Sequence, residues 1–117
     1  MSWWTWVDFD YIDPEEIGNT REFDIEHVRA EIESIVDSQR YHRDVAKDTC
    51  ELVAKKHAAF KINSFGVIEL FSVLAARFPD VSFAIRGRGE DMRDIWIREF
   101  AGGRNTFTFG PPEDFSY

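Results

Sequence analysis

The chain has 117 residues, of which 44% are hydrophobic and 15% aromatic, and its formal net charge is −8 at pH 7. This length predicts one domain, residues 1–112 followed by a flexible tail at 113–117, and the apolar content excludes a disordered chain. The negative charge argues against direct binding of nucleic acid, and no run approaches the ~18 apolar residues of a membrane span, so we expect a soluble cytoplasmic protein.

The first predicted element is a strand over residues 3–12. Aromatic and β-branched residues alternate there with a period of two, as in a half-buried strand. Asp13-Pro14 ends the strand, because proline cannot donate to the ladder. The aromatic content predicts a place in the interior of a sheet.

Three helices are predicted next, over residues 24–40, 44–60 and 63–78. The first has Asp24 as its N-cap and an apolar stripe at helical spacing. Its acidic residues lie off that stripe, so its outer surface should be acidic. The third helix has the clearest apolar face of the three, and the second has a weaker one.

Three short strands complete the chain, over residues 81–86, 94–100 and 105–109, with glycine-containing turns between them. Their short connections predict a meander. The fold class is therefore α+β: a single four-stranded antiparallel sheet with two to three helices packed on one face, in the order β-α-α-α-β-β-β.

Alternation along the strands also predicts which side chains the helices cover. The covered face is expected to carry Val7, Phe9, Phe83, Ile85, Ile95, Ile97, Phe107 and Phe109. The opposite face is expected to carry Trp4, Trp6, Asp8, Asp10, Arg86, Asp94, Trp96 and Arg98. Three tryptophans on an uncovered face indicate a partner or self-association surface, unless another segment folds over them and makes them core.

The surplus negative charge falls in the first 51 residues, which hold 14 Asp+Glu and 5 Lys+Arg, against 8 and 9 in the rest. Such a surface either keeps the protein soluble or is presented to a basic groove. The predicted partner-binding residues are Glu15, Glu16, Glu22, Glu26, Glu33, Asp37, Trp4, Trp6 and Trp96.

The sequence contains no motif with recognisable catalytic or metal-binding chemistry. The histidines lack ligand spacing, and Gly87-Arg88-Gly89 joins two strands, so a hairpin turn explains it better than a phosphate loop. We expect no catalytic residue, no metal and no cofactor. A rival hypothesis is an enzyme, or a metal-binding protein, with Asp8, Asp10 and Asp94 on the open face and Arg86 or Arg98 contacting an anionic substrate.

Part of the chain is similar to a known group of proteins. Leu74 to Phe83 reads LAARFPDVSF, and Gly89 to Trp96 reads GEDMRDIW. With the aromatic strand before Ile12-Asp13-Pro14, these runs resemble small ferredoxin-like proteins of phages, plasmids and actinobacterial mobile elements. The resemblance implies a mobile-element accessory protein. Small acidic proteins from that setting often inhibit host defence nucleases, anti-CRISPR proteins among them.

The expected function is therefore a non-enzymatic acidic binding protein. It would occupy a basic surface on a protein partner such as a nucleic-acid-handling defence complex, and it would contact neither nucleic acid nor membrane. A homo-oligomer whose Trp4, Trp6 and Trp96 faces pair is the structural alternative.

Overall fold

The computed structural model describes residues 4–12, 21–91 and 93–111. Glu15, Glu16 and the predicted tail at 113–117 lie outside these residues. The elements in chain order are β1 (Thr5–Tyr11), α1 (Ile25–Ser38), α2 (Asp44–Lys55), β2 (His57–Phe60), α3 (Ser64–Arg77), β3 (Phe83–Arg88), β4 (Ile95–Ala101) and β5 (Arg104–Phe109). The strands form one antiparallel sheet in the order β2-β1-β3-β4-β5.

The α+β class with one antiparallel sheet is confirmed, but the predicted four strands and the predicted order are wrong. The additional strand is β2, in a segment predicted as the end of the second helix. α2 ends at Lys55 because Lys56 adopts a left-handed conformation with φ of 73° and donates its N–H to the Leu52 carbonyl. Glycine is the usual residue at such a helix end. With a lysine there, the sequence does not signal the turn into β2.

β1 lies inside the sheet, between β2 and β3, as its aromatic content predicted. Its side chains alternate between buried and exposed from Thr5 to Asp10. Phe9 stacks on Phe83 of β3 with ring centroids 5.3 Å apart, and Phe83 stacks on Phe100 of β4 at 5.0 Å. A row of aromatic rings therefore crosses the sheet beneath the helices.

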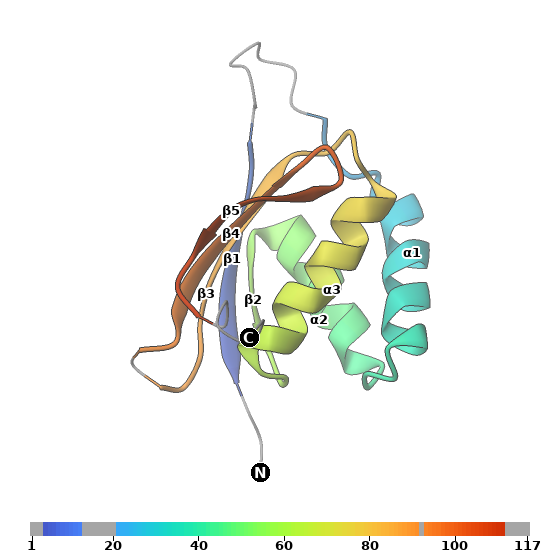
Figure 1. Cartoon of the computed structure of the whole chain (residues 1–117). Coiled ribbons are helices and arrows are strands. Elements are labelled where there is room, and N and C mark those ends of the chain that lie inside the picture. The colour runs from blue at the N-terminus through green and yellow to red at the C-terminus, as the bar shows by residue number, and fades with distance from the viewer. Residues whose placement is uncertain (1–3, 13–20, 92, 112–117) are drawn as a thin grey trace.

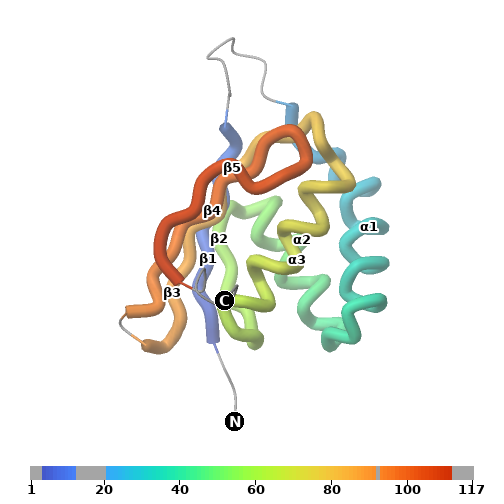
Figure 2. Tube along the Cα trace, in the orientation of Figure 1, coloured from blue at the N-terminus to red at the C-terminus, as the bar shows by residue number. Residues whose placement is uncertain are grey.

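The three helices cover one face of the sheet (Figure 1). α2 and α3 lie against strands, and α1 packs on these two helices, farthest from the sheet (Figure 2). The apolar stripe of α1 is buried in this packing and consists of Val28, Ile32, Ile35 and Val36. The polar side of α1 and the uncovered face of the sheet are therefore on opposite sides of the molecule.

The predicted faces of β4 and β5 are wrong. Trp96 is fully buried on the helix side and Ile95 is 49% exposed, the reverse of the expectation. Trp96 lies opposite Gly87 of β3, where the missing side chain leaves room for the indole. Phe107 and Phe109, expected in the core, are exposed because their register places them beside Glu99 and Ile97 on the uncovered side.

Arg98 is also buried on the helix side, against the expectation that it would lie on the open face. Its guanidinium donates to three main-chain carbonyls, those of Ile97 at 3.0 Å, Phe109 at 2.7 Å and Gly110 at 3.1 Å. Charge-assisted hydrogen bonds of this kind let a buried guanidinium replace its water shell.

Candidate functional site

The open face, the side of the sheet away from the helices, is built from side chains that the strand register places in rows. Directly paired residues project to the same side of a sheet. Three rows result: Ala59–Trp6–Arg88–Ile95, His57–Asp8–Arg86–Ile97–Phe109 and Asp10–Ala84–Glu99–Phe107.

One half of the open face is apolar. This apolar half lies over β4 and β5 and consists of Ile95, Ile97, Phe107 and Phe109. Phe107 is 46% exposed and Phe109 is 54% exposed, while Ile97 between them is half-buried. Trp6 of β1, 40% exposed, continues the apolar surface into the other half through the row that ends at Ile95.

The other half, over β2, β1 and β3, is charged. Arg86 and Asp8 form an exposed ion pair at 3.5 Å, and the Arg88 guanidinium lies 5.1 Å from the centroid of the Trp6 ring. A shallow hollow of about 520 Å³ follows these side chains and includes His57 of β2. Exposed ion pairs contribute little to the free energy of folding. The charges of this half therefore matter more for recognition of a partner than for stability.

Elsewhere in the described chain, exposed large hydrophobic side chains occur singly. Ile25 at the start of α1 is 44% exposed and Phe65 in the first turn of α3 is 46% exposed. Scattered apolar residues are normal on a protein surface, whereas a group on one uncovered face is not. The open face is therefore the strongest candidate interaction surface of the described residues.

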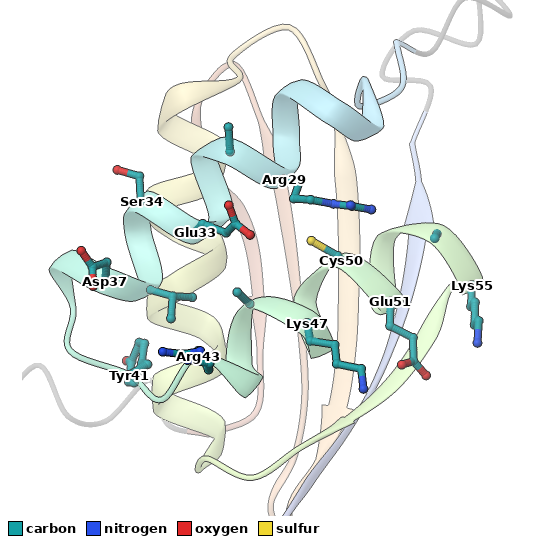
Figure 3. A pocket seen from close by; sticks show the side chains of 14 residues that line it. Arg29, Glu33, Ser34, Asp37, Tyr41, Arg43, Lys47, Cys50, Glu51 and Lys55 are labelled. Carbon is teal, nitrogen blue, oxygen red and sulfur yellow. The ribbon is translucent and has the colours of Figure 1, made fainter.

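A groove of about 1190 Å³ between α1 and α2 is the second candidate (Figure 3). Its floor includes small side chains, and charges of both signs line its walls. The acids are Glu33, Asp37 and Glu51, and the bases are Arg29, Arg43, Lys47 and Lys55. Four bases against three acids leave the groove with a small positive surplus.

Cys50 projects into this groove opposite Arg29 (Figure 3). Partial burial raises the pKa of the thiol, and the neighbouring Arg29 guanidinium opposes that shift without cancelling it. Little thiolate therefore forms near neutral pH, and the thiolate is the form that reacts and binds metals.

The structure separates the two parts of the predicted partner surface. Glu22, Glu26, Glu33 and Asp37 are exposed on α1 or just before it, and α1 is the helix farthest from the sheet. Trp6 is on the open face, and Trp4 is half-buried, with the Lys61 ammonium 5.4 Å from its ring centroid. Trp96 is excluded from any surface by its burial, so this predicted partner-binding residue is corrected to a core residue.

The residues of the rival enzyme hypothesis do not come together. Asp94 leaves the open face, because its carboxylate accepts a hydrogen bond from Ser64 Oγ at 2.8 Å beside the start of α3. Asp8 is paired with Arg86, and Arg98 is buried on the other side of the sheet. Within the described ranges, no three His, Cys, Asp or Glu side chains are grouped so that they could hold a metal ion.

Sequence reasoning missed the apolar half because it placed these four residues in the core. Gly87 could have signalled the error, since a glycine inside a strand often marks the close approach of a neighbouring group. Here that group is the Trp96 indole, and its position beside Gly87 determines which side chains of β4 face the helices.

Of the helices in the described residues, none combines the length and apolarity that a membrane span requires. No protein-family model matches this sequence, and neither a curated protein nor a solved structure gives a significant match.

Proposed function

We propose that this protein is a non-enzymatic binding module that docks onto another protein chain through its open face. The observation that carries the proposal is the grouping of Trp6, Ile95, Phe107 and Phe109, each at least 40% exposed, on one uncovered sheet. Monomeric proteins rarely expose apolar patches of this kind, and Trp and Arg are common energetic anchors of interfaces. Interfaces combine such an apolar centre with a polar rim, a role that the charged half can fill.

The strand edges are less suited to binding than the face. A partner strand can add to a sheet only where backbone groups are free along a straight edge. β2 is only four residues long. β5 has an irregular register where Glu99 and Phe100 meet it, and Arg98 already binds the Phe109 carbonyl at its end. Short and irregular edges of this kind oppose edge-to-edge pairing.

A second candidate surface is the acidic side of α1, on which Glu26, Glu33 and Asp37 are exposed. Their spacing of seven and four residues places them along one side of the helix. This side supports the narrower proposal of an acidic decoy that occupies a basic surface of a nucleic-acid-handling complex, such as the target of a phage or mobile-element inhibitor. The basic residues of the neighbouring groove weaken that candidate relative to the open face.

Affinity capture with surface variants tests both surfaces. The face variant is Phe107→Thr with Phe109→Thr, and the helix variant is Glu26→Lys with Glu33→Lys and Asp37→Lys. Phe65→Ser is the control, because Phe65 and Phe107 are each 46% exposed and only Phe107 is on the open face. We expect the face variant to lose a protein that the wild type and the control retain.

A bound protein that is washed off by salt and lost in the helix variant alone would favour the acidic surface instead. The same set of captured proteins in all four samples would contradict binding through either surface. Circular dichroism of each variant shows whether its fold is retained.

A further inference from the structure

We infer that the chain covering the open face is a second copy of this protein, packed sheet against sheet in a two-fold symmetric dimer. The inference rests on the proposed function and identifies the partner of the same face. Its basis is the placement of charge on the described surfaces.

The strand side chains of the open face carry no net charge, although the chain has a charge of −8. Its charged residues are three acids and three bases, Asp8, Asp10, Glu99, Arg86, Arg88 and Arg104, assigned to this face by the register. A face of this composition can meet a copy of itself, because acids of one copy can lie opposite bases of the other. It offers no surplus charge with which to attract a strongly charged partner.

Asp13, Glu15, Glu16, Glu113 and Asp114 lie outside the described residues, and the described residues have a surplus of three acids over bases, 17 against 14. This described surplus lies away from the open face. α1 carries Glu26, Glu31, Glu33 and Asp37 against Arg29 alone. This helix is farthest from the sheet (Figure 1). Sheet-to-sheet packing would separate the two copies of α1 by one sheet spacing of ~10 Å and, in each copy, by two further layers of ~8–10 Å each. That is several times the ~8 Å screening length at physiological salt, so the mutual repulsion of these helices would be small.

The layout of the face also fits a symmetric interface. Packing the apolar halves on each other would cover Ile95, Phe107 and Phe109 of both copies. The charged half of each copy would then form the rim, next to Trp6 and Arg88. Two aligned sheets with an apolar filling are a common arrangement of stacked sheets.

Sedimentation equilibrium over a range of concentrations tests the dimer. We expect a species of twice the 13.7 kDa chain mass. Phe107→Thr with Phe109→Thr should raise the dissociation constant of the dimer by roughly 30-fold or more, the size expected for interface anchors. Phe65→Ser should leave it unchanged. Raising the salt concentration should change it by less than about threefold, because the apolar half forms the centre of the interface and the charge pairs lie at its solvent-exposed rim.

A mass of 13.7 kDa at every concentration would overturn the inference. So would a dimer that Phe107→Thr with Phe109→Thr does not weaken, or one that salt dissociates. These outcomes differ from failure of the proposed function. The protein could be a monomer in sedimentation and still capture another protein that the face variant loses. That result would support the binding module and refute only the proposal that the partner is a second copy.

Discussion

The contact between Gly87 and Trp96 determines which side chains of β4 face the helices. A Cβ atom at position 87 would lie 2.2 Å from the indole, far inside van der Waals contact. Trp96 has no exposed surface, and its Nε1 has no hydrogen-bond partner among the described residues. Packing alone therefore holds the ring, and a buried N–H without a partner itself costs about 1–3 kcal/mol.

Gly87→Ala should lower the free energy of unfolding by about 2–3 kcal/mol, because the added methyl group overpacks the core. Urea titration measures this loss. In a Trp96→Leu background the same substitution should cost clearly less, because the clashing ring is absent. An equal cost in both backgrounds would contradict the proposed contact.

Tyr41 is the second residue with a specific physical consequence. Burial first, and then the hydrogen bond from its hydroxyl to Glu69 Oε1 at 3.1 Å, raise the pKa of the phenol to about 12. The folded state thus favours the neutral phenol. Its stabilising effect is present below the ordinary pKa of about 10 and is lost as the pH rises toward 12.

Ultraviolet titration of tyrosinate should therefore show a tyrosine with a midpoint near pH 12 that is missing in Tyr41→Phe. The free energy of unfolding of the wild type should also fall more steeply between pH 10 and pH 12 than that of the variant. A wild-type titration with all midpoints near 10 would refute the assignment.

At the scale of elements, the helix starts could be read from the sequence and the end of α2 could not. The sequence predicts Asp24 as a cap and either Asn63 or Ser64 as another. In the structure Asp24 and Asn63 are the caps, and each accepts a hydrogen bond from the backbone N–H three residues later. The left-handed turn at Lys56 has no glycine to announce it, so β2 was predicted as helix. Local chemistry signals the first kind of boundary, whereas tertiary pairing with β1 determines the second.

β4 shows a different limit. Its sequence Ile-Trp-Ile-Arg-Glu-Phe contains two alternating apolar sets, and either set could face the core. Which set faces the core depends on Gly87 in the neighbouring strand, and on main-chain carbonyls that accept hydrogen bonds from the Arg98 guanidinium. The facing of β4 determines the apolar half of the open face, so the sequence did not predict that half. The sequence predicted a face of three tryptophans instead, and of these only Trp6 is clearly exposed.

Asn63→Ala should destabilise the protein by about 1 kcal/mol, because the Asn63 side chain accepts a hydrogen bond from the Gly66 N–H at 2.9 Å and caps α3. Asn63→Asp keeps an acceptor at this position and should restore most of the loss. Thermal unfolding of both variants provides the measurement. A stable Asn63→Ala variant would show that packing of α3 makes its cap dispensable.

At the scale of the whole molecule, charge follows layers and not halves of the sequence. The acidic first 51 residues include β1, but β1 lies next to β3, whose Arg86 and Arg88 come from the later, near-neutral part. Pairing of distant segments neutralises the open face and leaves the surplus partly on α1. Counting charges along the chain predicts an acidic first helix, but it cannot predict a balanced sheet face, because that face combines strands from both parts of the sequence.

The central position of β1 has a further consequence, for the order of events as the chain folds. The first strand can pair with β2 only when residues 57–60 are present, and with β3 only when residues 83–88 are present. Closing such long loops costs chain entropy before any contact repays it, and proteins rich in distant pairings fold slowly. During synthesis, Trp6, Val7 and Phe9 therefore remain without their sheet partners until most of the domain has been made, and this is the interval in which the nascent chain is most exposed to misassembly.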